Sequence, residues 1–317
     1  MTTNSVAVIG SGVIGLSSAL AIKETHRDLE VTVLSDRPIN EITSIGPPGL
    51  FRPHYPKFNK WSLPTRDWLH YLANQYPPTA TGVHMFSGYQ TDDTMETLNK
   101  QSESGQLLNY RILDDDERRM LAFKDRYASF YTSWGCQGRL YVPWLIKQLK
   151  YRGATFQTCK VKAFSELAGD FDCVINCSGL GAKVLTDDPL LIPVRGVLIE
   201  VDAPWQRHML YSKSATYVIP GVHNAIVGGS RQPNRWDRTV TDDDRNDIWS
   251  RILDLAPSLR NNTDLAPRVE IDHLRTHNGP MTIIHNYGHG GSGFTMSWGC
   301  AQEVRKLVDE GHRRARL

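Results

Sequence analysis

The beginning of the chain alternates between apolar runs and a helical pattern of apolar positions. Residues 6–9 are uniformly apolar, which predicts a short buried strand, and residues 13–23 have the apolar periodicity of a helix. A second apolar run at residues 31–34 predicts another strand. A strand, a helix and a second strand in this order are typical of parallel sheets covered by helices, so we expect an α/β fold.

The middle of the chain has a pattern that is typical of antiparallel sheets. Strands are expected at residues 82–90, 107–113, 196–202, 216–220 and 225–228, and helices at residues 61–74, 92–101 and 242–255. The strands at residues 216–220 and 225–228 are joined by the short segment GVHN, which predicts a hairpin. The helix at residues 242–255 begins with aspartates, which are favourable at the positive end of a helix dipole.

Further stretches return to the α/β pattern. A helix is expected at residues 144–150 and strands at residues 154–156, 160–161, 171–177 and 281–285, with a final helix at residues 296–308. Between residues 38 and 60 five prolines interrupt any regular pattern. A long irregular segment inside a compact domain is usually functional, so this segment is a candidate part of a site.

Composition narrows the class of protein. The chain has 317 residues, of which 40% are hydrophobic, enough for one large or two smaller cores, and a net charge of +2 that does not suggest a nucleic-acid-binding protein. It contains no apolar run long enough for a membrane span, and the first strand begins too early to leave room for a signal peptide. Its five cysteines match no zinc spacing, so we expect reduced thiols and no metal.

A glycine motif follows the first strand. Gly10, Gly12 and Gly15 have the spacing that allows a tight turn, close approach of a pyrophosphate to the backbone, and packing of a helix on a strand. The next helical turn would offer its N–H groups to the phosphates. Asp36 follows the second strand, where an acid that binds a ribose hydroxyl is expected. The motif favours a dinucleotide site, and the alternative is an ordinary α/β unit with a glycine turn.

The segment HNYGHGGSGFT at residues 285–295 strongly resembles the signature of the D-amino acid oxidase and D-aspartate oxidase family. Other landmarks occur in the order that the family has, at residues 34–37, 141–145, 174–179, 195–196 and 217–221. The resemblance covers essentially the whole chain. It implies FAD as a non-covalent cofactor and oxidative deamination of a D-amino acid by molecular oxygen, with hydrogen peroxide as a product.

The resemblance also implies which residues bind FAD. They are Gly10, Gly12, Val13, Ile14, Gly15, Asp36, Arg37, Thr43, Ser44, Gly49, Leu50, Val161, Ser178, Gly179, Gly290, Gly291, Gly293, Phe294 and Thr295. The expected architecture is a Rossmann-like FAD-binding domain interleaved with a mainly antiparallel-sheet substrate domain. We assign residues 1–50, 138–185 and 281–317 to the first domain, and residues 51–137 and 186–280 to the second.

Family members bind the α-carboxylate of the substrate with a tyrosine and an arginine, which the motifs place at Tyr217 and Arg268. A guanidinium suits this task because it forms two parallel charge-assisted hydrogen bonds. The segment before Arg268 is shorter than the family pattern. A second family tyrosine falls at Lys213, so Tyr211 is carried over only weakly. Ser292 is expected to contact the substrate as well.

Substrate preference is expected from two further positions. The segment GGSRQ at residues 228–232 is close to the pattern of members that act on acidic substrates, and His54 falls where those members have a histidine. A buried arginine near the pocket is costly unless it is paired, and a second carboxylate on the substrate would pair Arg231. These residues favour D-aspartate, with D-glutamate next.

Other functions remain open from the sequence alone. They are a D-amino acid oxidase for neutral substrates, a glycine or sarcosine-type flavin oxidase, a non-catalytic flavoprotein of the same fold, and an NAD-dependent dehydrogenase. The last three residues, Ala315, Arg316 and Leu317, resemble the tripeptide that the peroxisomal import receptor binds, which implies a peroxisomal location.

Overall fold

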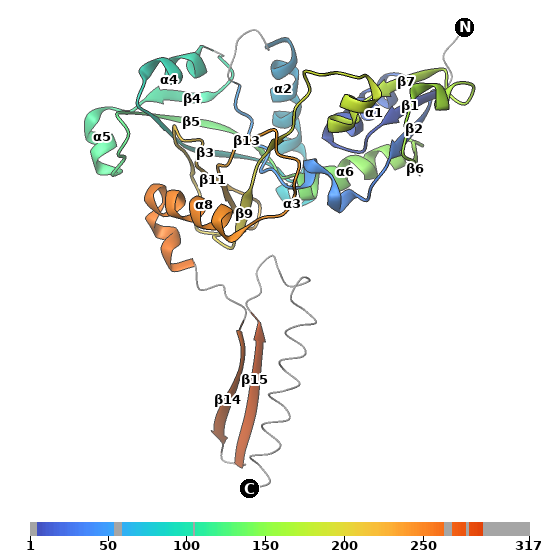
Figure 1. Ribbon diagram of the computed structural model, residues 1–317. Helices are drawn as coiled ribbons and strands as arrows, with labels where there is room; N and C mark the ends of the chain where they lie inside the picture. Colours follow the sequence, from blue (N-terminus) through green and yellow to red (C-terminus); the bar gives the residue numbers. More distant parts are fainter. Residues whose placement is uncertain (1–4, 54–58, 104, 263–267, 277–278, 288–317) are drawn as a thin grey trace.

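The computed structural model describes residues 5–53, 59–103, 105–262, 268–276 and 279–287, and from residue 261 onward it describes the backbone alone. Two sheets form the body of the molecule, a four-stranded parallel sheet and a seven-stranded mixed sheet (Figure 1). They lie side by side, with helix α2 (Asn59–Gln75) between them in the view of Figure 1.

The parallel sheet has the strand order β6-β2-β1-β7. Its strands are β1 (Ser5–Ile9), β2 (Glu30–Ser35), β6 (Thr155–Thr158) and β7 (Cys173–Asn176). Helices α1 (Val13–Thr25) and α6 (Gly138–Tyr151) cover one face, where Leu16, Leu20 and Leu145 pack against Val6 and Val8. Because side chains alternate along a strand, Ala7 and Ile9 point to the other face and pack with Leu167.

The mixed sheet has the strand order β4-β5-β3-β10-β11-β12-β9. Its strands are β3 (Val83–Asp92), β4 (Leu108–Ile112), β5 (Tyr127–Cys136), β9 (Leu198–Val201), β10 (Met209–Tyr211), β11 (Tyr217–Pro220) and β12 (Ala225–Gly228). All neighbours are antiparallel except β3 and β10, which are parallel. Helix α8 (Asp242–Leu255) covers one face, where Ile248 and Ile252 pack against Val218 and Val227.

Shorter elements complete the described part of the chain. They are α3 (Pro78–Thr81), α4 (Met95–Ser102), α5 (Asp115–Met120), α7 (Ala182–Leu185), the 3-10 helices at Ile39–Glu41, Thr43–Ile45, Phe164–Leu167, Gly179–Gly181 and Pro257–Asn262, and the paired strands β8 (Val194–Arg195) with β13 (Gln232–Pro233) and β14 (Arg268–Thr276) with β15 (Gly279–Tyr287). Among the described residues, no helix is both long and apolar enough to span a membrane.

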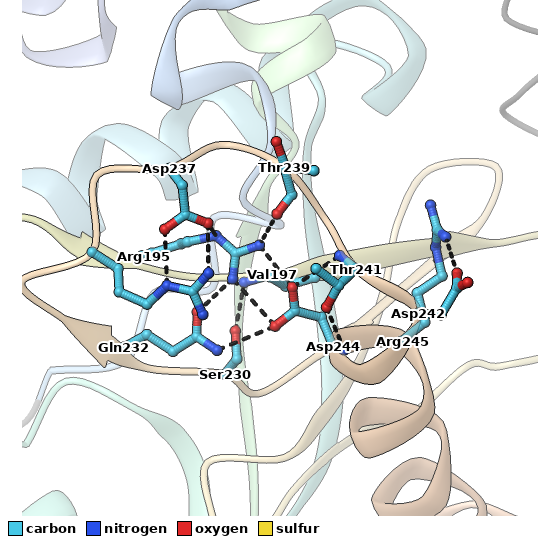
Figure 2. A network of polar contacts seen from close by, with 11 residues as sticks. Arg195, Val197, Ser230, Gln232, Asp237, Thr239, Thr241, Asp242, Asp244 and Arg245 are labelled. Carbon is cyan, nitrogen blue, oxygen red and sulfur yellow. Dashed lines mark hydrogen bonds and ion pairs between the residues drawn. The ribbon is translucent and has the colours of Figure 1, made fainter.

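A buried network joins the short β8–β13 pair to the beginning of α8 (Figure 2). Arg195 donates two hydrogen bonds to the carboxylate of Asp244, at 2.8 and 3.2 Å, and a further one to the side chain of Gln232. Asp244 also closes a capping box with Thr241, in which each residue accepts a hydrogen bond from the backbone N–H of the other. The network therefore fixes where α8 begins and how it meets β8 and β13.

The structure confirms most of the expected elements, corrects two of them and adds a long strand. Residues 160–161 are not a strand, and α6 begins at Gly138, ahead of the expected residue 144. The ten-residue strand β5 was not expected, because polar Ser129 and Ser133 are fully buried within it and mask the apolar pattern. The expected helix at residues 296–308 lies outside the described residues.

Candidate functional site

The turn after β1 approaches two neighbouring strands very closely. Gly10 has φ of +111°, and its N–H donates to the carbonyl of Leu34 at the end of β2, at 2.7 Å. A Cβ atom at Gly10 would stand 2.3 Å from the carbonyl oxygen of Cys177 after β7, and one at Gly15 would stand 2.0 Å from the carbonyl oxygen of Gly10. Since no side chain fits at either position, the two glycines are required by the packing of β1, β7 and α1.

The N-terminus of α1 has features that favour binding of an anion. Gly12 is the N-cap and provides no side-chain cap, and the first turn contains no acidic residue. The N–H of Val13 donates to Ser44 Oγ at 3.0 Å, while Ile14 next to it is largely exposed. The backbone N–H groups of the first turn together with the positive end of the helix dipole favour a phosphate here. Thr43 and Ser44 form the 3-10 helix beside this N-terminus.

A cavity of about 170 Å³ opens at the carboxyl ends of β1, β2 and β6, lined in part by Ser11, Ser35, Arg37 and Phe156. Strand β1 is where the chain order of the sheet reverses, with β2 on one side and β7 on the other. In open α/β sheets ligands bind at such a reversal. The carboxylate of Asp36 pairs with Arg37 at 2.8 Å, and this hydrogen bond holds the pKa of Asp36 below its ordinary value.

Other expected cofactor residues lie near the same sheet. Ser178 follows β7 and its hydroxyl donates to Asn176 at 2.7 Å, and the adjacent Gly179 has φ of +58°. Val161 follows β6 and packs in the apolar cluster on the face opposite α1. The expected Gly290, Gly291, Gly293, Phe294 and Thr295, and the expected substrate contact Ser292, lie outside the described residues.

A second, larger cavity of about 310 Å³ lies between the irregular segment and the mixed sheet. Its lining includes Gly49, Leu50 and Arg52 from the segment, and Tyr211 and Tyr217 from β10 and β11. Two backbone hydrogen bonds attach the segment to the end of β5. The N–H of Phe51 donates to the carbonyl of Trp134 at 2.8 Å, and the N–H of Cys136 donates to the carbonyl of Gly49 at 3.1 Å. This cavity is large enough for a small amino acid.

The two tyrosines form one wall of this larger cavity. Tyr211 and Tyr217 are paired across β10 and β11, and their rings stack with centroids 6.0 Å apart. Burial raises the pKa of Tyr217, so its hydroxyl stays protonated at neutral pH and can donate a hydrogen bond. Gly228 lies opposite Tyr217, where a Cβ atom would stand 2.6 Å from the tyrosine hydroxyl.

The structure does not place the other expected substrate residues in the lining of the larger cavity. Arg231 is exposed and does not line the cavity. Arg268 is the first residue of β14, where the structure describes only the backbone, and His54 lies outside the described residues. No role was predicted for Arg52, although it lies in the irregular segment that was expected to be part of a site.

Comparison of the sequence with known proteins shows the family to which the chain belongs. The family model described as FAD dependent oxidoreductase matches residues 5–307. D-aspartate oxidase 2 of Caenorhabditis briggsae is 37% identical over 96% of this chain and 97% of its own, and human D-aspartate oxidase is 32% identical over 98% and 96%.

The chain belongs to the D-amino acid oxidase and D-aspartate oxidase family of FAD-dependent oxidoreductases. Solved structures agree on the fold. Glycine oxidase from Geobacillus kaustophilus superposes with a TM-score of 0.66 at 16% identity, covering 97% of this chain and 95% of its own. L-alpha-glycerophosphate oxidase from Mycoplasma pneumoniae, solved with FAD bound, gives a TM-score of 0.64 at 17% identity, covering 98% and 95%.

The described residues of this family member fit its cofactor. The N-terminus of α1, which has no acidic residue in its first turn, suits the pyrophosphate of FAD, and the cavity that Ser11, Ser35 and Arg37 line suits the adenosine half. The glycines at positions 10 and 15 hold the strand and helix close together, as this kind of site requires. FAD is therefore the cofactor, as the sequence predicted.

Proposed function

We propose that this protein oxidises acidic D-amino acids, D-aspartate first and D-glutamate next, to the 2-oxo acid and ammonia, with oxygen reduced to hydrogen peroxide. The observation that carries the proposal is kinship over nearly the full length with proteins named D-aspartate oxidase, from two Caenorhabditis species and from human, at 32–37% identity. The segment GGSRQ at residues 228–232 supports the acidic preference.

Tyr217 is the described residue best placed to bind the α-carboxylate. Its hydroxyl is a neutral donor on the wall of the larger cavity, next to the stacked ring of Tyr211. We propose that it acts together with Arg268, because a guanidinium and a hydroxyl on one carboxylate fix both its charge and its orientation. FAD, when bound, accepts the electrons, and the chain contributes binding, orientation and exclusion of water.

A substrate panel tests the proposal. The purified holoenzyme is assayed for peroxide release with D-aspartate, D-glutamate, D-asparagine, D-alanine, D-methionine and glycine, and with L-aspartate as the stereochemical control. We expect kcat/KM to be highest for D-aspartate and negligible for L-aspartate. Higher kcat/KM for D-alanine or D-methionine would show an oxidase for neutral substrates instead. Relatives from Dugesia ryukyuensis and Streptomyces coelicolor, at 31% and 29% identity, are named D-amino acid oxidase.

An anaerobic experiment separates an enzyme from a non-catalytic flavoprotein. Each D-amino acid is added to the holoenzyme without oxygen, and the visible absorbance of the flavin is followed. We expect D-aspartate to bleach the absorbance. A yellow protein that no amino acid of the panel bleaches would contradict the proposed function altogether.

A further inference from the structure

Arg52 places a positive charge in the larger cavity. It lines this cavity together with Tyr211 and Tyr217, and its side chain is partly buried. The central carbon of its guanidinium lies 3.6 Å from the centroid of the Tyr211 ring, a cation–π contact that holds the group against this wall of the cavity. The charge is therefore next to the two rings that would border a bound substrate.

Among the described residues, Arg52 has a weak hydrogen-bond partner. Arg52 Nη1 donates to Gln90 Oε1 at 3.5 Å, and the same oxygen accepts a hydrogen bond from the hydroxyl of Tyr131 at 3.4 Å. No carboxylate lies within ion-pair distance of Arg52 in the described part of the chain. Both hydrogen bonds are long, and a partly buried guanidinium is stabilised far better by a carboxylate than by a shared amide oxygen.

The position of Arg52 is fixed before any ligand arrives. The preceding residue, Phe51, is hydrogen-bonded to β5 through its N–H to Trp134 and through its carbonyl to the hydroxyl of Ser133. The ring of Phe51 also packs edge-on against Trp134, with centroids 5.8 Å apart. A charge on a backbone held in this way is preorganised, which adds selectivity because little freedom is lost on binding.

We propose that Arg52 binds the side-chain carboxylate of an acidic substrate and is the residue that sets the preference for D-aspartate over neutral D-amino acids. This inference rests on the proposed function. With the α-carboxylate held by Tyr217 and Arg268, a second carboxylate is the group that pairs the remaining charge of the cavity. Arg231, the position that the sequence favours for this task, is exposed and outside the cavity lining.

Two pairs of ligands, each differing by one negative charge, test the assignment in the holoenzyme. D-aspartate and D-asparagine differ in the charge of the side chain, and succinate and butyrate differ in one terminal carboxylate. For the amino acids kcat/KM is measured, and for the unreactive acids the dissociation constant is measured from the change in flavin absorbance. The variants are Arg52→Gln, Arg52→Lys and Arg231→Gln.

Arg52→Gln is expected to lower kcat/KM for D-aspartate by about 30-fold or more, the effect of removing one partner of a desolvated charge pair. We expect D-asparagine to change less than about threefold, and the affinity for succinate to fall by about 30-fold or more while that for butyrate is kept. Arg52→Lys keeps the charge and is expected to recover part of the D-aspartate preference. Arg126→Gln is the matched control, because Arg126 also lies over a tyrosine ring, Tyr127, at 5.3 Å, but does not line the cavity.

The outcomes separate the inference from the function on which it rests. A wild-type enzyme that prefers D-asparagine to D-aspartate overturns the proposed function and the role of Arg52 with it. A wild-type enzyme that prefers D-aspartate, with a D-aspartate to D-asparagine ratio that Arg52→Gln leaves unchanged, overturns the role of Arg52 alone. If kcat/KM for D-aspartate falls selectively in Arg231→Gln but not in Arg52→Gln, then Arg231 binds the side-chain carboxylate, and the inference is likewise overturned.

Discussion

Arg195 and Asp244 are 49 residues apart in the chain, and their side chains meet with 2.8 Å between Nη2 and Oδ2. Both side chains are almost completely excluded from solvent, at 6% and 7% exposure. The hydrogen bonds from Arg195 hold the pKa of Asp244 well below its ordinary value of 3.8, so the carboxylate stays charged at any pH at which the protein works. The pair therefore fastens the beginning of α8 to the β8–β13 strands.

Replacing Arg195 is expected to destabilise the protein, because Asp244 and Gln232 would lose a buried partner. We expect Arg195→Met to lower the melting temperature by several degrees in thermal unfolding at pH 7. The matched control is Arg245→Met, since Arg245 pairs with Asp242 at the same end of α8 but on the exposed surface. An equal effect of the two variants would contradict a special role for the buried pair.

The same pair predicts how stability depends on acid. A carboxyl group whose pKa is lower in the folded state contributes stability that is present above its unfolded pKa and is lost as the pH falls through the folded value. Wild-type stability should therefore fall as the pH drops below the ordinary value of 3.8 for Asp244. Urea unfolding at pH 7 and at pH 3 should show a smaller pH dependence in Asp244→Asn than in the wild type.

Gly15 should be essential for FAD binding. A Cβ atom there would stand 2.0 Å from the carbonyl oxygen of Gly10, so Gly15→Ala must move α1 away from β1 and disturb the anion site. We expect the dissociation constant of FAD, titrated by fluorescence with apoprotein, to rise at least about tenfold, or about 1.4 kcal/mol. Gly196→Ala is the control, because its Cβ atom would make only an ordinary 3.6 Å contact. Unchanged FAD affinity in Gly15→Ala would refute this account of the glycine motif.

Tyr217 and Arg268 should affect all substrates alike. Tyr217→Phe removes a hydrogen bond to a charged group, which contributes about 1.5–3 kcal/mol, so kcat/KM should fall by about 10- to 150-fold for acidic and neutral D-amino acids. We expect Arg268→Ala to lower kcat/KM further for every substrate, because every substrate carries an α-carboxylate. Steady-state kinetics on D-aspartate and D-alanine measures both variants. A loss confined to one substrate class would show that the residue contacts the side chain of the substrate instead.

Peroxisomal location stays a prediction from the last three residues, Ala315, Arg316 and Leu317. A chain with a fluorescent protein at its N-terminus should collect in the organelles that contain catalase, where peroxide is removed. The same fusion without residues 315–317 should remain diffuse in the cytosol. If both fusions have the same distribution in microscopy, the import receptor does not recognise this tripeptide.

Local pattern was sufficient to predict most elements but not the contacts between distant segments. The helix at residues 242–255 was predicted with its bounds because the polar start and the apolar periodicity lie within the helix itself. Strand β5 was missed because Ser129 and Ser133 are buried within it, and Ser133 is held by a hydrogen bond to the carbonyl of the distant Phe51. Burial that a remote segment imposes leaves no local signal.

The residues of the candidate site likewise differ in how far a short stretch of sequence can predict them. The glycine motif and Tyr217 could be proposed from the sequence, because a tight turn and a family motif each depend on a short stretch of residues. Arg52 was not assigned a role, because its importance depends on Tyr211 and Gln90, which arrive from strands far along the chain. The division into FAD-binding and substrate domains, with its boundaries, stays a prediction, as do the roles of the expected site residues, including Tyr217, Arg268, His54 and Ser292.

The parallel pairing of β3 with β10 has a consequence for biosynthesis. Met209 pairs with Gly88, so the mixed sheet cannot be completed until the ribosome has made residues far beyond β3, and the register of β11 depends on β10 in turn. Closing such long loops makes folding slow, and the apolar faces stay accessible meanwhile. The larger cavity therefore forms only late in translation. Nascent chains that end before Tyr217 are expected to depend on chaperones.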